Sequence, residues 1–305
     1  MGEFEPGYIR LHRSGALARR IEDAGEILKD CTLCPWHCHV NRPAGEKGVC
    51  RVGALPMVAS YGPHFGEERP LVGVHGSGTI FLSFCNLKCV FCQNYDISHL
   101  GEGREVQTEE LAEMMLSLWR QGCHNINFVT PSHQAAQIIA ALPHAIEAGL
   151  DIPLAYNCSG YEELATLRLL NGIFDIYMPD FKYGDSATAL RLSGTPHYVE
   201  TAREALKEMH RQVGDLVMDG RGIGRRGLLV RHLVLPGGLA GTRQVMGFIA
   251  REISPDTYVN IMNQYRPCFR AADPPMNRRI TAAEFGEAVA IAREEGVRRL
   301  DGITA

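Results

Sequence analysis

Residues 79–94 read TIFLSFCNLKCVFCQN, a short apolar segment that runs directly into three cysteines. The apolar segment, residues 79–84, predicts a buried strand, so Cys85, Cys89 and Cys92 follow it on one loop. Thiolates are the protein ligands of iron–sulfur clusters, and three of them at this spacing suit three irons of a [4Fe-4S] cluster. No fourth cysteine follows nearby, which leaves one iron open to a ligand from outside the chain. The alternative is a zinc knuckle with a distant fourth ligand, although zinc sites usually combine two close cysteine pairs.

Similar apolar runs recur along the chain and alternate with amphipathic stretches. Buried parallel strands are expected at residues 79–84, 125–130, 153–157, 173–178, 228–235 and 258–262. Helices are expected at residues 108–121, 133–148, 162–170, 198–213, 241–253 and 281–295, the last with Thr281 and Glu284 at capping-box spacing. This order predicts an α/β fold, a partial or full (β/α) TIM-like barrel with its chemistry at the carboxyl ends of the strands. A doubly wound open sheet is the alternative.

The first 75 residues have a different character, because Pro and Gly interrupt them and little periodicity is present beyond a helix expected at residues 14–29. Four cysteines lie in this region: Cys31, Cys34, Cys38 and Cys50. Four thiolates close a coordination shell, so we expect a structural or electron-transferring metal site, either zinc or a second [4Fe-4S] cluster. The chain is therefore expected to comprise a cysteine-rich N-terminal extension, residues 1–75, and a barrel domain, residues 76–305.

Composition limits the class of protein. The 305 residues are 45% hydrophobic and 22% charged, which suits a globular chain with a substantial core. No apolar run approaches the roughly 18 residues of a membrane span, and residues 1–6 lack the features of a signal peptide. Ten cysteines, mostly clustered, favour metal binding in a reducing compartment, so a cytoplasmic location is expected. The net charge of -4 favours no nucleic-acid partner, and the scattered arginines at 221, 225, 226 and 231 fit a solvated loop better than a phosphate track.

The cysteine loop, with Phe91 directly before its last cysteine, resembles that of the radical S-adenosylmethionine (SAM) superfamily. The resemblance implies a barrel of that type, in which the open iron of a [4Fe-4S] cluster chelates SAM. It also implies that an electron from the reduced cluster cleaves SAM to methionine and a 5′-deoxyadenosyl radical, which abstracts hydrogen from a substrate. In such enzymes the cofactor supplies the difficult chemistry and the protein supplies geometry and the exclusion of water.

Later segments resemble the pyruvate formate-lyase activating enzymes and their longer relatives. By this resemblance, six residues at strand ends are implied at the SAM site: Thr130, Ser132, Asn157, Asp180, Lys182 and His232. Asp180 and Lys182 match an Asp-Leu-Lys segment of those enzymes, and Lys182 would pair with the SAM carboxylate. Considered from the residues alone, the acid and base also suit a solvated salt-bridge loop, and His232 suits a buried core position.

Polar residues also follow the last expected strand, where the sequence reads MNQYRP. Their position at a barrel mouth favours a substrate site formed by Asn263, Gln264 and Tyr265. A polar turn after a buried strand would have the same sequence.

The resemblance implies an oxidoreductase that activates a glycyl-radical enzyme by taking hydrogen from one of its glycines. Its implied partners are SAM, an electron donor such as flavodoxin or ferredoxin, and the glycyl-radical enzyme itself. The alternative within the same reaction class is a radical SAM enzyme that modifies a small molecule or peptide. A third hypothesis is a metal-stabilised binding module without turnover, which would contain zinc alone.

Overall fold

Six apolar runs of the sequence form six parallel strands at the centre of the protein. The computed structural model, which describes residues 4–302, places them side by side in the order β2-β4-β5-β6-β8-β9. Their bounds are β2 (Ser77–Leu82), β4 (Ile126–Val129), β5 (Leu154–Cys158), β6 (Ile176–Pro179), β8 (Gly224–Leu233) and β9 (Tyr258–Met262). Each overlaps a strand expected from the sequence, because β-branched and aromatic runs of this length are stable when both faces are buried.

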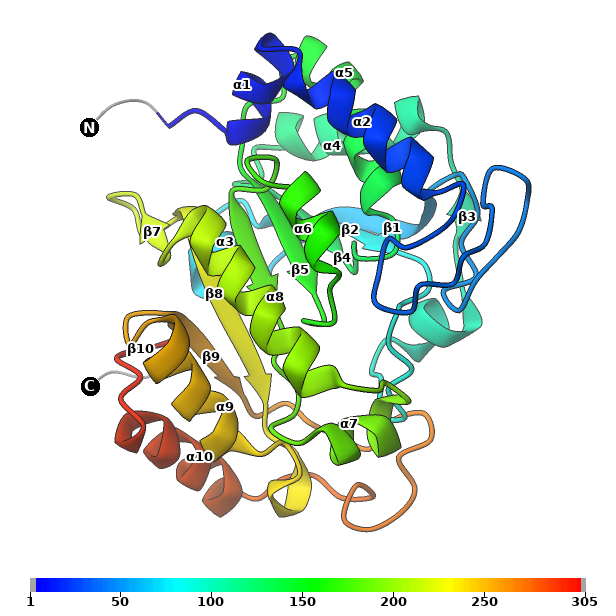
Figure 1. Ribbon diagram of the computed structural model, residues 1–305. Coiled ribbons are helices and arrows are strands. Elements are labelled where there is room, and N and C mark those ends of the chain that lie inside the picture. Colours follow the sequence, from blue (N-terminus) through cyan, green and yellow to red (C-terminus); the bar gives the residue numbers. More distant parts are fainter. Residues whose placement is uncertain (1–3, 303–305) are drawn as a thin grey trace.

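Short strands extend the sheet at both sides. On one side β10 (Arg299–Leu300) pairs in parallel with β9, and on the other β1 (Met57–His64) pairs antiparallel with β2 and with β3 (Arg104–Glu105). A further strand, β7 (Val217–Met218), pairs antiparallel with β8. Within residues 4–302, no pairing joins β10 to β3, so the sheet stays open (Figure 1). The fold is a partial α/β barrel, which was one of the two forms that the sequence predicted.

Helices connect the strands and cover the outside of the sheet. Those expected from the sequence are α4 (Thr108–Arg120), α5 (Ala135–Glu147), α6 (Leu164–Leu169), α8 (Tyr198–Val213), α9 (Thr242–Phe248) with the π-helix η3 (Ile249–Ile253), and α10 (Ala282–Glu294). Helix α10 begins with the expected capping box, in which Thr281 and Glu284 each bond to the other's backbone N–H. Helix α2 (Ala16–Ile27) was also expected, at residues 14–29. The remaining helical segments are α1 (Gly7–Arg13), α3 (Arg69–Val72), α7 (Ser186–Ser193), the π-helix η1 (Asp96–Leu100) and the 3₁₀ turn η2 (Pro236–Gly238).

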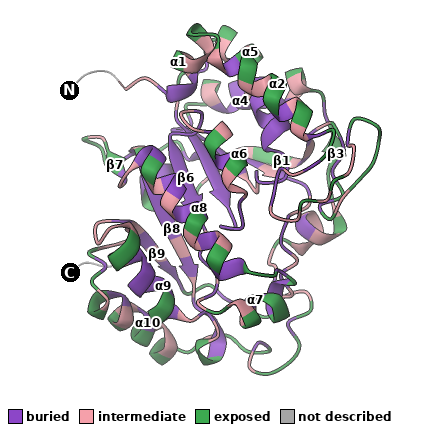
Figure 2. Cartoon of the chain, viewed as in Figure 1, coloured by how far each residue is buried: buried purple, intermediate pink, exposed green. Residues whose placement is uncertain are grey.

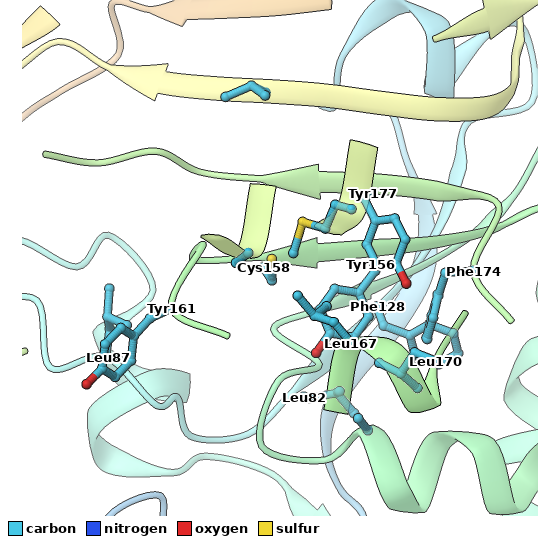
Figure 3. Packing of buried hydrophobic residues seen from close by; sticks show 14 of the residues in the cluster. Leu82, Leu87, Phe128, Tyr156, Cys158, Tyr161, Leu167, Leu170, Phe174 and Tyr177 are labelled. Atoms are coloured by element: carbon cyan, nitrogen blue, oxygen red, sulfur yellow. The ribbon is translucent and has the colours of Figure 1, made fainter. Parts of the chain in front are cut away.

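The main core lies between the sheet and these helices. The central strands are buried along their length, whereas the helices expose their outer faces (Figure 2). Aromatic rings fill the space behind β4, β5 and β6, where Tyr156 packs edge-on against Phe174 with ring centroids 4.8 Å apart. Phe128 and Tyr177 extend the same group (Figure 3). Edge-to-face packing of this kind adds specific geometry to the burial of apolar area.

The N-terminal helices close the amino end of the barrel. Helices α1 and α2 pack on α5, as Figure 1 shows. The Gly7 N–H donates to Asp175 Oδ1 at 3.0 Å and the Tyr8 hydroxyl donates to the Ile152 carbonyl at 2.9 Å. A side chain at position 7 would clash, because a Cβ there would lie 2.3 Å from the Gly172 carbonyl oxygen. Residues 4–75 thus contribute to the helical layer and, through β1, to the sheet. The domain boundary at residue 75 stays a prediction.

No helix within residues 4–302 is both long and apolar enough to cross a membrane.

Candidate active site

A cavity of about 260 Å³ opens at the carboxyl ends of the parallel strands. Nine of the residues that the sequence singled out line it: Cys85, Cys89, Phe91, Cys92, Thr130, Asn157, Asp180, Lys182 and Gln264. They come from the end of β5 and from the loops after β2, β4, β6 and β9, which are far apart in the sequence. The parallel sheet brings these loops together, as expected for chemistry at the carboxyl edge.

The cysteine loop is held rigidly on one side of this cavity. The Asn86 side chain donates to the Tyr161 carbonyl at 2.7 Å, and the backbone N–H of Lys88 donates to the Ser193 carbonyl at 3.1 Å. Phe84, directly before the first cysteine, has φ of 66° and turns the chain out of β2. These contacts fix the loop from both the β5 side and the α7 side, so its three sulfur atoms are preorganised.

Each sulfur of the loop accepts a hydrogen bond. The donors are the Leu87 N–H to Cys85 Sγ at 3.4 Å, the Ser193 hydroxyl to Cys89 Sγ at 3.0 Å and the Ser98 hydroxyl to Cys92 Sγ at 3.0 Å. Hydrogen bonds to cysteine sulfur stabilise thiolate charge and tune the potential of iron–sulfur clusters.

Burial raises the pKa of Cys85 and of Cys89. Burial, and next the Cys89 thiolate charge, raise the pKa of Cys85 to about 12. Within residues 4–302, no three Cys, His, Asp or Glu side chains converge on a position for one metal ion. The thiolates of a cubane bind different irons and lie farther apart than the ligands of one ion. Cys85, Cys89 and Cys92 therefore fit a cubane cluster that is attached to the chain through three of its four irons.

Opposite the cysteines, a buried carboxylate joins two cations. Asp180 accepts from Arg231 Nε at 2.7 Å through one oxygen and from Lys182 Nζ through the other. Burial alone would raise the pKa of Asp180, but Arg231 and Lys182 outweigh it and hold the pKa below its ordinary value. Burial lowers the pKa of Lys182, and Asp180 more than restores it, so Lys182 stays an ammonium. The ammonium has three donors and only one partner among the described residues, which leaves donors for an anionic ligand.

Arg231 links this group to the interior of the barrel. Its Nη2 donates to Asn157 Oδ1 at 2.7 Å and its Nη1 to Glu67 Oε2 at 3.4 Å, while its side chain is 16% exposed. Asn157 lines the cavity, and its buried Nδ2 atom has no partner among the described residues. The arginine at 231, which the sequence suggested lies in a solvated loop, is in fact a buried residue of β8 with three hydrogen-bonding partners.

Beneath Arg231, two carboxylates enter the barrel from the segment between β1 and α3. Glu68 accepts from the Asn260 amide at 3.0 Å, and its carboxylate lies 3.8 Å from Arg231 Nη1. Burial raises the pKa of Glu67 to about 7. The charge of Arg231 lowers this pKa, and the neighbouring Glu68 raises it. Nothing in residues 67–68 of the sequence signals this position, because β1 itself was not expected.

Four residues expected at the site lie outside the cavity. His232 is buried between the Phe181 carbonyl and the Thr242 hydroxyl, and Ser132 donates to Glu162 at 2.5 Å. Tyr265 packs against Phe91 with ring centroids 5.9 Å apart and donates its hydroxyl to the Met276 carbonyl, while Asn263 is exposed next to the mouth. Their functional roles stay predictions.

Glu162 gives the protein a pH-dependent stability. Its buried carboxyl accepts from Ser132 and from the Tyr156 hydroxyl at 2.9 Å, and burial raises its pKa from 4.5 to about 7 in spite of these donors. The folded protein therefore keeps a proton that the unfolded chain releases between these two pH values. The free energy of unfolding consequently falls as pH rises through this window, with a contribution of about 3 kcal/mol.

We expect Glu162→Gln to remove this slope. The variant should equal the wild type near pH 5 and be the more stable of the two at pH 8, as measured by anaerobic urea unfolding at a series of pH values. The exposed Glu147→Gln change serves as the control. Parallel pH profiles for wild type and Glu162→Gln would contradict the assignment.

The N-terminal cysteines are brought together by a tight local fold. Cys31, Cys34 and Cys50 are buried, Cys38 is half-buried, and all are free thiols. Cys38 Sγ accepts from the Val49 N–H at 3.4 Å, and a Cβ at Gly48 would lie 2.6 Å from that sulfur.

The four N-terminal thiols lie near enough to influence one another electrostatically. Burial raises the pKa of Cys34 first, and the charges of Cys50, Cys31 and Cys38 raise it further. Within residues 4–302 these side chains do not converge on a position for one metal ion, so a metal at the four cysteines stays a prediction. This region also contacts the cavity loop, because Trp36 Nε1 donates to the Asn86 carbonyl at 2.6 Å.

Comparison with known proteins agrees with this geometry. A family model described as the radical SAM superfamily matches residues 79–224, from β2 into β8. Uncharacterized protein MJ0674 of Methanocaldococcus jannaschii is 32% identical over 286 residues, which cover 90% of this chain and 78% of that protein. The chain belongs to the radical SAM superfamily. It is therefore an enzyme of a class that works with a [4Fe-4S] cluster and SAM.

Solved structures of other radical SAM proteins share the fold. HydG, a maturase of the [FeFe]-hydrogenase, superposes with a TM-score of 0.51 at 13% identity, covering 72% of this chain and 49% of HydG. HydG from Carboxydothermus hydrogenoformans gives a TM-score of 0.50 at 12% identity, covering 73% of this chain and 52% of that one. This radical SAM chain thus spans about half the length of these structures, and the likeness concerns the fold alone.

Proposed function

We propose that this radical SAM enzyme is an activating-enzyme-like oxidoreductase, which takes a hydrogen atom from a backbone glycine of a partner protein. The observation that carries the proposal is that the three loop cysteines share one cavity with the Asp180, Lys182 and Arg231 group. When bound, the cluster supplies the electron that cleaves SAM to methionine and the hydrogen-abstracting 5′-deoxyadenosyl radical.

The residues of the chain bind and orient the two cofactors. Cys85, Cys89 and Cys92 would hold the cluster, and Lys182 would donate to the SAM carboxylate. Phe91, Thr130 and Asn157 line the same space and would limit the positions of SAM. The expected contacts of Ser132 and His232 with SAM would be indirect, through the loops that they support.

The size of the cavity favours a substrate at the mouth. About 260 Å³ is below the usual range of roughly 300–1,000 Å³ for small-molecule sites, so SAM beside a cluster would leave little internal space. A substrate would then approach from outside, past Gln264, which lies at the mouth, and the exposed Asn263. A flexible protein loop can reach such a position, which is why we favour a protein glycine over a small molecule or peptide.

The test of this proposal is anaerobic. The protein is reconstituted with iron and sulfide, reduced with dithionite and mixed with SAM, and 5′-deoxyadenosine and methionine are quantified by mass spectrometry. Extract from cells of the source organism grown on [2,2-²H₂]glycine is then separated by dialysis into protein and small-molecule fractions. Deuterium in 5′-deoxyadenosine with the protein fraction alone supports the activase role, and deuterium with the small-molecule fraction alone supports the alternative. No 5′-deoxyadenosine from a fully loaded protein would overturn SAM cleavage itself.

Lys182→Ala is expected to weaken SAM binding by about 5- to 150-fold, which corresponds to about 1–3 kcal/mol for a buried charged hydrogen bond. Titration calorimetry of SAM into the anaerobic, oxidised protein measures the effect without turnover. Lys207→Ala, on the exposed face of α8, is the control and should bind SAM as the wild type does. Wild-type affinity in Lys182→Ala would remove this residue from the SAM site.

We also infer a second metal centre, either zinc or [4Fe-4S], at the four N-terminal cysteines Cys31, Cys34, Cys38 and Cys50. Four thiolate donors support either metal.

Ten free thiols suit a reducing compartment, so we place the enzyme in the cytoplasm. A low-potential electron donor such as flavodoxin or ferredoxin would be its redox partner, and the net charge of -4 favours no nucleic acid.

A further inference from the structure

A second cavity, of about 360 Å³, is also lined by part of the cysteine loop but shares no lining residue with the SAM cavity. Its lining consists of Arg51, Lys88, Val90, His99, Leu100, Phe269 and Arg270. These residues come from three separate parts of the chain: the end of the N-terminal cysteine region, the cysteine loop with η1, and the loop after β9. We call this lining the basic surface.

The basic surface carries positive charge without a counter-charge. No carboxylate lines it, and Arg51, Lys88 and Arg270 form no ion pair with any residue of the described range 4–302. Elsewhere on the protein, exposed arginines such as Arg243 and Arg278 bond to glutamates at 2.7–2.9 Å. Like charges held together without acids destabilise a fold slightly, and the cluster stands out in a chain of net charge -4.

The surface touches the backbone of the cluster-binding loop. Lys88 Nζ donates to the Cys85 carbonyl at 3.2 Å, and the His99 ring lies 3.0 Å from the Cys89 carbonyl. The Arg270 N–H donates to the Val90 carbonyl at 2.8 Å. The thiols of the same loop line the SAM cavity, so one short loop contributes residues both to the basic surface and to the cluster position.

This placement suits the entry of electrons. Electron tunnelling falls steeply with distance, so a donor must approach a surface close to the cluster. The mouth of the SAM cavity has to admit SAM and substrate, whereas the basic surface leaves that mouth open. One electron passes from the reduced donor, which is oxidised, to the enzyme for each SAM cleaved, and no covalent bond forms between the two proteins.

The chemistry of the surface indicates the kind of donor. Arginine together with exposed apolar groups is typical of protein interfaces, and Leu100 is 63% exposed beside the Phe269 ring, which Arg270 covers at 4.9 Å. Electron-transfer complexes are small and depend on opposite charge for rapid association. We propose that the basic surface is the docking site for a small, acidic, low-potential flavin or iron–sulfur electron-transfer protein. This inference rests on the proposed function, because it assigns a partner to the same cluster loop.

The test compares reduction of the enzyme by an electron-transfer protein with reduction by a chemical reductant. The double variant Arg51→Glu/Arg270→Glu reverses two charges whose side chains bond to neither the cysteines nor the SAM cavity. With dithionite, its rate of SAM cleavage should stay within about twofold of wild type. With reduced flavodoxin at low ionic strength, its kcat/KM for flavodoxin should fall at least about tenfold, and the salt dependence of the wild type should be largely lost. The control Arg19→Glu/Arg120→Glu reverses two distant exposed charges and should keep both rates.

A binding measurement separates this inference from the proposed function. Titration calorimetry of oxidised flavodoxin into the reconstituted enzyme needs no turnover, and binding to wild type but not to the double variant supports docking even where SAM cleavage fails. Unchanged flavodoxin affinity and rate in the double variant would overturn the docking site. An equal loss with dithionite and flavodoxin would also overturn it, because the lesion would then lie in the active site. Binding of inorganic phosphate with no binding of flavodoxin would identify a small-anion site instead.

Discussion

Cys89→Ala is expected to leave SAM cleavage undetectable, a loss of at least about a thousandfold. The reason is that a cubane attached by only two thiolates is poorly held. The Ser193 hydroxyl that now donates to Cys89 Sγ cannot replace a thiolate. The measurement is 5′-deoxyadenosine formation with dithionite, together with iron content and the visible absorption of the cluster.

The matched control uses another buried cysteine of the same cavity. Cys158 lies at the end of β5, lines the cavity and belongs to neither cysteine group. Cys158→Ala should therefore load iron as the wild type does and retain SAM cleavage. Equal activity in Cys89→Ala and wild type would refute the assignment of the cluster to this loop, whatever the result for Cys158→Ala.

Arg231→Met should lower the free energy of unfolding by about 3–5 kcal/mol, because it leaves Glu67 and Glu68 without their cation and Asp180 with Lys182 alone. Three partners depend on the one guanidinium: Asp180, Asn157 and Glu67. Arg231→Lys should restore only part of the stability, since the compact ammonium of lysine cannot bond to all three partners that the planar guanidinium of arginine reaches. Urea unfolding of the anaerobic, reconstituted protein measures both variants.

A surface arginine provides the comparison for that experiment. Arg251 bonds to Glu295 at 2.6 Å but is 67% exposed, so Arg251→Met should cost less than about 1 kcal/mol. The double variant Arg231→Met/Asp180→Asn should recover stability relative to Arg231→Met, because it removes the charge that Arg231 neutralised. A loss in Arg231→Met no larger than that in Arg251→Met would show that the ionic network contributes little.

Much of the fold could be predicted because local signals agreed with the tertiary structure. The strand expected at residues 258–262 and the helix expected at residues 198–213 coincide with β9 and α8. The capping box of Thr281 and Glu284 marked the start of α10. By contrast, β1 was not expected, because its sequence contains Gly62 and Pro63 and its pairing with β2 is a tertiary contact.

The site shows the same division between local and long-range information. The cysteine motif and the Asp180–Lys182 pair could be read from spacing and resemblance, and both line the cavity. Arg231 was missed because strands buried on both faces show no alternation that would reveal which residues face the barrel interior. A usable signal was present, since a cation inside an apolar strand requires a buried partner and Asp180 follows the neighbouring strand.

Tyr265 shows that the position of a residue in a loop does not give the direction of its side chain. It directly follows Gln264, which lines the cavity, yet its ring turns into the core beside Phe91 and its hydroxyl reaches the Met276 carbonyl. Ser132 is similar, because the turn before α5 directs it toward Glu162. The orientation of loop side chains depends on contacts with distant segments, which the order of residues alone does not specify.

The open sheet has a consequence for how the protein behaves at high concentration. An unclosed barrel leaves two outer strands, and outer strands with free N–H and C=O groups can recruit a second chain into an aggregate. Here β3 and β10 are two residues long each, and they pair only with Met57 and Val58 of β1 and with Tyr258 and Val259 of β9. The charged residues of these outer strands, Arg104, Glu105 and Arg299, oppose pairing with the edge of a second sheet. Charge at the outer strands therefore limits the edge pairing to which an open sheet is prone.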